Sequence, residues 1–318
     1  MQKVVFLALS LFIIPAVHGQ EKALHNPDSV QFITKDIDNF WLMYHRLKDA
    51  RTTQDTIDLV QTAYLDKASL VLQDRMTEKH GITAKGFLWG LRSFPKYIAS
   101  IEKSTKSINN HFPVVLNDFK KLKAIYPDAV FFDHYFIIGD FNAGGRPLPH
   151  GIFVGAEITA ADKSSPLDEF DKIPALKYGI NTADKLAIIC CHELVHRQQK
   201  GTENSLLAYC INEGAADFVG ELMSGGLTTN YQHQYGTAHE KELWLMFKKD
   251  TATNNYNHWL YNSNVKDIPK DMGYFIGYKI CEAYYKKAAD KKQAVKDILE
   301  VTDYKAFLEK SGYGSNFE

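Results

Sequence analysis

The residues best placed to do chemistry lie in one pentapeptide, HELVH, at positions 192–196. On a helix, His192 and His196 would be about 40° apart around the axis and about 6 Å apart along it. Both imidazoles would then face one side and could share a zinc ion. Glu193 would be turned about 100° from His192, so it could reach a water on the metal without being a ligand. This pattern is typical of a zinc peptidase, with two histidine ligands and a general base.

A plain helix with two histidines and no metal is the alternative. The residues just before the motif, 186–191 (LAIICC), form an unbroken apolar run, so the helix is expected to be buried. Two unpaired histidines and a glutamate that continue this run would be costly to bury. We therefore predict a metal site here. The helix is expected to begin at Asn181 or Thr182 and to stop at Gly201.

A third ligand is expected on the next helix, within residues 203–224. Glu213 and Asp217 interrupt its apolar spacing at positions i and i+4, on one face. Buried carboxylates without partners would carry a large desolvation cost. A metal offsets that cost for Glu213, and the second N–H of a metal-bound histidine offsets it for Asp217. Asn212 could serve the other histidine. The alternative is an acidic pair that faces solvent.

A group that stabilises the oxyanion of peptide hydrolysis is expected in GYFIGYKICEAYY, residues 273–285. Tyr274 and Tyr278 lie four residues apart on one helical face, and either hydroxyl could donate to the oxyanion. The alternative is an aromatic packing face. Three histidines compete for the same role: His233, His239 and His258. The sequence leaves this choice open.

Helices and a small sheet are expected to position these residues. Apolar residues recur at helical spacing through residues 29–125, which predicts a helical layer. Two strands are predicted at 129–138 and 151–158, with a loop at 139–149 between them. An irregular connection follows, and the helical pattern resumes at Thr182. The predicted fold class is α+β, mostly helical.

The chain is expected to be exported. Lys3, an apolar run at 4–14 and Pro15 have the layout of a secretory signal peptide. A membrane anchor is the alternative, but the run has only about 11 residues and a span needs about 20. No later stretch approaches a membrane span, so we expect a soluble periplasmic or secreted protein cleaved near Gly19-Gln20. The expected organisation is a signal peptide at 1–19, an N-terminal helical region at 20–125 and a metallopeptidase region at 126–318.

Composition excludes several classes of protein. The chain has 318 residues with 37 Lys+Arg against 38 Asp+Glu, and this balance gives no basic surface for nucleic acid. Four cysteines are too few for a disulfide-built scaffold of this size. Cys190 and Cys191 are adjacent and would not readily bridge each other. Buried free thiols are favoured over one pairing across helices.

HELVH with a following NEGAADFVG resembles the gluzincin metallopeptidases. Their pattern is HExxH on one helix, then Glu with Asp four residues later on the next. The resemblance implies a zincin-like core, and it implies these roles: His192, His196 and Glu213 as Zn²⁺ ligands, Glu193 as the base, and Asp217 and Asn212 as residues that support the ligands. The ligand spacing is shorter than in thermolysin, which indicates a different family of the same clan.

A closer similarity is to bacterial predicted zinc-dependent proteases related to gliding-motility lipoprotein B. It is carried by GIFVGAEI at 151–158, EGAADF at 213–218 and GYFIGYKI at 273–280. The lipid-attachment cysteine of that family is missing, so membrane tethering is not implied. In gluzincins the edge strand beside the zinc helix pairs with the substrate backbone. Gly155 and Ala156 are the candidates for that part, and an ordinary sheet strand is the alternative.

The predicted function is an exported zinc-dependent peptidase. Glu193 would take a proton from the attacking water and deliver it to the leaving amine. The alternative is a non-catalytic envelope protein in which a structural or vestigial zinc site acts through partner binding. The intact Glu193 argues against decay, because a structural site needs no base. A peptidoglycan peptide hydrolase would share the chemistry and differ in substrate. The expected partners are a peptide or protein substrate and no nucleic acid, with room for an envelope partner.

Overall fold

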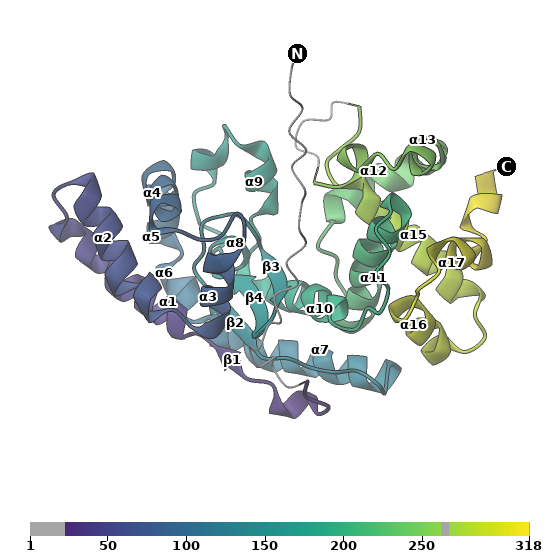
Figure 1. The fold of residues 1–318 in the computed structure, drawn as a ribbon, viewed down its shortest axis with the longest axis horizontal. Helices are drawn as coiled ribbons and strands as arrows, with labels where there is room; N and C mark the ends of the chain where they lie inside the picture. The colour runs from purple at the N-terminus through teal and green to yellow at the C-terminus, as the bar shows by residue number, and fades with distance from the viewer. Residues whose placement is uncertain (1–22, 262–266, 318) are drawn as a thin grey trace, which may run out of the picture.

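The computed structural model describes residues 23–261 and 267–317, so the predicted signal peptide lies outside the described residues. Helices dominate the described chain, and four short strands form a small sheet near its centre (Figure 1). The predicted class, α+β and mostly helical, is confirmed. None of the described helices is both long enough and apolar enough to cross a bilayer.

The N-terminal helices up to residue 106 lie beside the sheet at the left of Figure 1, in purple to blue, whereas the helix that follows them runs along the bottom of the view. They carry the aromatic core residues Phe40, Trp41 and Tyr64, which are almost fully buried. Their bounds are α1 (Lys35–Arg46), α2 (Thr53–Ala63), α3 (Leu70–Thr77), α4 (Ala84–Ser93), α5 (Pro95–Ser100), α6 (Glu102–Lys106) and α7 (Phe112–Ile125).

The C-terminal helices pack on the other side, in green to yellow at the right of Figure 1. Between the two groups lies α10 (Leu186–His196), which packs against α11, α7 and the sheet. The other helices of the second half are α8 (Ala156–Thr159), α9 (Pro174–Gly179), α11 (Leu206–Ser224), α12 (Asn230–Ala238), α13 (Glu240–Thr253), α14 (Tyr256–Trp259), α15 (Met272–Lys287), α16 (Lys291–Leu299) and α17 (Tyr304–Ser311).

The sheet has the strand order β1-β2-β4-β3. Strands β1 and β4 run parallel to β2, whereas β3 runs antiparallel to β4. All of β4 is buried, which fits its near-continuous apolar sequence. The strands are β1 (Phe32–Ile33), β2 (His134–Ile137), β3 (Gly145–Leu148) and β4 (Gly151–Gly155).

The strand predictions need three corrections. The strand predicted at 129–138 is shorter than expected, because β2 covers only His134–Ile137. Residues 139–149, predicted as a loop, contain β3, because pairing with β4 overrides the turn preference of Gly145 and Pro147. The strand predicted at 151–158 ends at Gly155, and the next four residues form the buried turn α8. The free edge beside α10 therefore belongs to β3, and β4 is an inner strand paired on both sides.

Two glycines let α11 and α15 approach closely. A Cβ at Gly214 would lie 2.0 Å from the backbone nitrogen of Tyr278, and a Cβ at Gly277 would lie 1.6 Å from the carbonyl oxygen of Cys210. Neither helix could therefore carry a side chain at these positions without moving apart. All four cysteines lie in the described part of the chain and are buried free thiols, as favoured from the sequence.

One glutamate near the sheet, Glu157, is buried in surroundings that disfavour its ionised form. Glu157 on α8 is fully buried and accepts hydrogen bonds from the backbone N–H groups of Gly139 (2.7 Å) and Phe141 (3.1 Å). Burial outweighs these bonds and raises the pKa of Glu157 to about 7. The folded chain therefore keeps this proton at pH values where the unfolded chain, with an ordinary glutamate pKa, has lost it.

We predict that stability falls as pH rises through this window. Because the pKa of Glu157 is higher in the folded chain than in the unfolded chain, a rise in pH favours the unfolded chain. Between pH 5.5 and 7.5 this lowers the free energy of unfolding by about 2 kcal/mol. Denaturant unfolding of wild type and Glu157→Gln at both pH values measures the difference. Parallel pH dependences of the two proteins would contradict the assignment.

Candidate metal centre

Three side chains from two helices converge on one point. The Nε2 atoms of His192 and His196 lie 3.1 Å apart, and Glu213 Oε2 lies 3.5 Å and 3.3 Å from them. The two histidines are one turn apart on α10, and Glu213 faces them from α11. These are the three residues that the sequence singled out as ligands, and among the described residues they form a group able to hold a metal ion.

The spacing of these atoms suits zinc. Zinc bonds to nitrogen and oxygen are about 2.0–2.1 Å long, and a tetrahedral arrangement puts the ligand atoms about 3.3 Å apart. The three observed separations bracket this value. Glu213 Oε2 is also buried without a hydrogen-bond partner among the described residues. An orphaned carboxylate oxygen that faces two imidazole nitrogens is the arrangement a cation would satisfy.

The hydrogen bonds behind the histidines fix which nitrogen faces the centre. Asp217 Oδ1 lies 2.9 Å from His192 Nδ1, the contact expected from the sequence. Thr228 donates to Asp217 at 2.5 Å, and the Thr229 hydroxyl also donates to it, so this carboxylate is held from three sides. His192 therefore places its N–H on Asp217 and leaves the Nε2 lone pair for a metal.

His196 is supported differently from the prediction. Its Nδ1 lies 3.0 Å from Gln199 Oε1, and Gln199 Nε2 donates to the backbone carbonyl of Asn212 at 2.7 Å. The Asn212 side chain instead accepts a hydrogen bond from the Tyr304 hydroxyl at 2.8 Å. Asn212 thus reaches His196 only through its carbonyl and Gln199. The helix ends at His196, before the predicted Gly201, so Gln199 lies in the loop and its role was not apparent from helical spacing.

Glu193 lies beside this cluster and touches the edge strand. A Cβ at Gly145 of β3 would lie 2.4 Å from Cγ and Oε1 of Glu193, so only glycine leaves room for this carboxylate. Glu193 is 8% exposed, and burial raises its pKa. A raised pKa makes the carboxylate a stronger proton acceptor, which suits a general base. No sequence pattern indicated Gly145 as a site residue, because its place beside α10 depends on the pairing of β3.

The cluster holds protons when no metal is present. Burial alone would lower the pKa of His192, but its contacts with Asp217 and Glu213 outweigh burial and raise it above the usual value. Burial would likewise raise the pKa of Glu213, but the neighbouring histidines hold it well below its usual range. Metal binding must displace these protons, so metal affinity should weaken as pH falls.

The candidates for oxyanion stabilisation separate clearly. The Tyr274 ring stacks on His192, with ring centroids 6.1 Å apart, so it lies at the centre. The Tyr278 hydroxyl donates to Glu221, about 12 Å along α11 from Glu213, and its ring packs against His233. Tyr278 and His233 thus form a separate contact on the α12 side. His239 contacts the backbone carbonyl of Tyr235, and His258 contacts the carboxylate of Asp250, so neither contact involves the cluster.

A tyrosine that the sequence did not single out also reaches the centre. The Tyr261 hydroxyl donates to Glu213 Oε1 at 2.9 Å. It comes from the segment after α14, far from Glu213 in sequence, and no spacing rule connects the two. Glu213 therefore uses one oxygen for Tyr261 and turns the other to the histidines.

Residues 175–307 match a family model described as Predicted Zn-dependent protease (DUF2268). The matched stretch contains HELVH, Glu213 and Asp217, so zinc dependence is what the family description and the side-chain cluster both indicate. The chain matches no curated protein and no solved structure.

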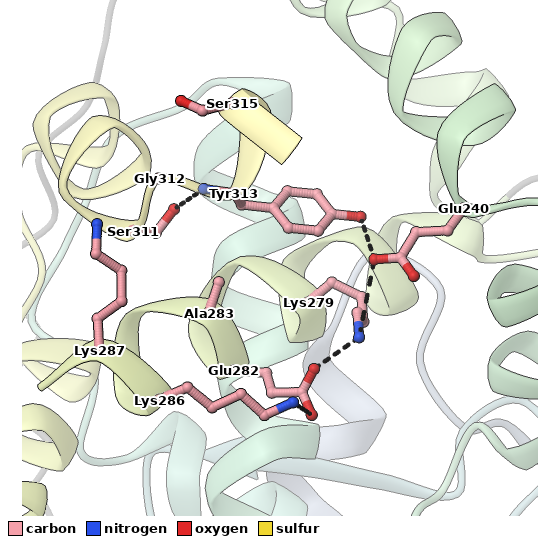
Figure 2. Close-up of a pocket in the computed structure, with 10 residues that line it drawn as sticks. All are labelled: Glu240, Lys279, Glu282, Ala283, Lys286, Lys287, Ser311, Gly312, Tyr313 and Ser315. Atoms are coloured by element: carbon pink, nitrogen blue, oxygen red, sulfur yellow. Dashed lines mark hydrogen bonds and ion pairs between the residues drawn. The ribbon is translucent and has the colours of Figure 1, made fainter. Parts of the chain in front are cut away.

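A pocket of about 510 Å³ lies elsewhere, between α15, the end of α17 and the start of α13 (Figure 2). Most of its charged groups pair with one another. Glu282 binds Lys279 (2.6 Å) and Lys286 (2.7 Å), and the Tyr313 hydroxyl donates to Glu240. The pocket shares no lining residue with the metal cluster.

We predict that the protein binds one zinc ion at this cluster. With free zinc at about a hundred times Kd, the free energy of unfolding should rise by about 3 kcal/mol, because the unfolded chain lacks the assembled site. His196→Ala should abolish this gain. His45→Ala, which alters an exposed histidine bound to Glu102, is the control. Calorimetry and thermal unfolding measure both, and an undiminished zinc effect in His196→Ala would refute the site.

Proposed function

We propose that this chain is an exported zinc-dependent peptidase of gluzincin type. The observation that carries the proposal is Glu193, a buried carboxylate at the side of three converging ligand groups. The match of residues 175–307 to predicted zinc-dependent proteases supports it. The ligand set would be His192, His196 and Glu213. When bound, zinc would act as a Lewis acid that lowers the pKa of a coordinated water to about 7 and polarises a carbonyl group.

The chain's own residues supply the remaining parts of the reaction. Glu193 accepts the proton of the attacking water and passes it to the leaving amine. Asp217 holds His192 in the tautomer that presents Nε2, and Gln199 does the same for His196. Tyr274, stacked on His192, is the favoured residue for steadying the oxyanion.

The edge of β3 offers a place for the substrate backbone. The Gly155 N–H donates to the Gly144 carbonyl, so in the antiparallel pairing Gly145 turns its own N–H and carbonyl away from β4. Pro147 has the same orientation, and its missing N–H therefore costs the β3–β4 pairing nothing. An extended peptide could add to this edge beside Glu193. In this proposal β3 pairs with the substrate backbone, a role that was predicted from the sequence for Gly155 and Ala156.

The proposal includes export, which rests on the signal-peptide layout of residues 1–19. A secreted or periplasmic protein would begin at about Gln20. An exported protein that retained Met1 would contradict this part. The substrate would be a peptide or protein, with peptidoglycan peptides as one class.

A non-catalytic envelope protein with a structural zinc site is the second candidate. The wild-type protein with bound zinc should cleave members of a mixed peptide library, followed by mass spectrometry, and a chelator should stop the cleavage. Zinc bound without cleavage of any peptide or envelope protein would favour the second candidate.

We predict that Glu193→Gln keeps zinc and loses hydrolysis. The amide cannot accept the water proton, so turnover should fall at least about 100-fold. Zinc content and peptide cleavage are measured on the same sample. Full turnover in this variant would exclude Glu193 as the base.

A second prediction concerns the contact between β3 and Glu193. Gly145→Ala should lower turnover about 100-fold with zinc retained, because the new Cβ forces the carboxylate out of position. Gly179→Ala is the matched control, since a Cβ at that position has no atom within 4 Å. Equal turnover in the two variants would show that the packing of Gly145 does not position the base.

A further inference from the structure

Tyr261 connects an exposed surface to Glu213, a half-buried candidate ligand. Tyr261 is 68% exposed, yet its hydroxyl donates a hydrogen bond to Glu213 Oε1 at 2.9 Å. Its neighbour in the fold is Asp271, directly before α15, the helix that places Tyr274 against His192. Tyr261 therefore contacts one oxygen of Glu213, and the two histidines face the other.

The backbone holds Tyr261 in this place against its own preference. Tyr261 has φ of 57° and Asp271 has φ of 61°, both in the left-handed region that non-glycine residues rarely adopt. Each of these conformations is unfavourable for a residue with a side chain. The two strained residues are joined, since the Tyr261 N–H donates to Asp271 Oδ1 at 2.6 Å. Strain of this kind persists where the surrounding structure fixes a conformation, and it is concentrated at functional sites.

The hydrogen bond distinguishes the two oxygens of Glu213. Oε1 accepts a hydrogen bond from the Tyr261 hydroxyl. Oε2 is buried, has no hydrogen-bond partner within residues 23–261 and 267–317, and faces the histidine nitrogens. A carboxylate free to rotate could offer either oxygen or both to a metal. With Oε1 engaged, the geometry favours a single metal bond through Oε2.

We propose that Tyr261 is a positioning residue, which orients Glu213 so that one oxygen alone binds the metal. The inference rests on the proposed zinc site and adds a residue that no sequence pattern indicated. Tyr261 acts through Glu213 and needs no contact with substrate. Partners of metal ligands commonly contribute 10- to 100-fold in metal affinity.

The test is Tyr261→Phe, which removes the hydroxyl and leaves the exposed ring. Zinc affinity, measured by competition with a chromophoric chelator, should weaken about 10- to 100-fold. Thermal unfolding of the metal-free protein should change only slightly, because the variant keeps the ring and loses one hydrogen bond. Tyr178→Phe is the control: Tyr178 is 78% exposed, stacks on Tyr231 and should keep wild-type affinity.

Cobalt(II) provides a second readout that a merely structural role would not change. In Tyr261→Phe the second oxygen of Glu213 can approach the ion, so the visible bands should weaken, as expected for higher coordination. The Tyr178→Phe spectrum should superimpose on wild type. Wild-type zinc affinity and an unchanged cobalt spectrum in Tyr261→Phe would overturn the proposal.

Failure of the peptidase function is distinguishable from failure of this inference. If wild type binds zinc but cleaves nothing, the peptidase function fails while the affinity loss in Tyr261→Phe still supports the positioning role. If wild type binds no zinc, the positioning role fails as well.

Discussion

The arrangement around the centre depends on one electrostatic constraint. Two imidazole nitrogens and a carboxylate oxygen, from His192, His196 and Glu213, face one another in a buried place. Three acceptors so close together repel unless protons or a cation lie between them. The supporting hydrogen bonds increase this demand, because Asp217 and Gln199 draw the histidine N–H groups to the far side. The cluster is thus prepared for a positive charge, and a divalent ion meets the demand better than shared protons do.

The close packing of α11 against α15 holds the residues around this cluster in place. Gly214 and Gly277 let the two backbones meet, and the contact brings Tyr274 onto His192. Asp271, at the start of α15, fixes Tyr261 over Glu213. Side chains at either glycine would separate the helices and withdraw both tyrosines. The candidate ligands therefore come from α10 and α11, while α15 and the segment before it supply groups that contact them.

The sequence predicted the parts of the site that follow from a single helix. The separation of His192 from His196, and of Glu213 from Asp217, is fixed by helical geometry, so spacing alone predicted which side chains share a face. The mostly helical character of the fold was predicted from the same kind of periodicity. Residues whose position depends on tertiary contacts could not be found in this way. Strand β3 contains glycine and proline and is only four residues long, so its local preference indicated a turn. Gly145 contacts Glu193 and Tyr261 contacts Glu213 only in the folded structure, and no periodic pattern in the sequence indicates these contacts.

The N-terminal helical region acquires a physical role from the same edge strand. Glu78, just after α3, accepts a hydrogen bond from Arg146 of β3 at 2.9 Å. Asp74 of α3 binds His150, two residues after β3, through both its backbone N–H and its imidazole. The edge strand is thus tied to α3 within its length and just beyond its end. Because Gly145 of that strand packs directly on Glu193, a shift of α3 would move the carboxylate beside the metal cluster. The N-terminal helices therefore do more than cover the sheet, since they fix the strand against which Glu193 is held.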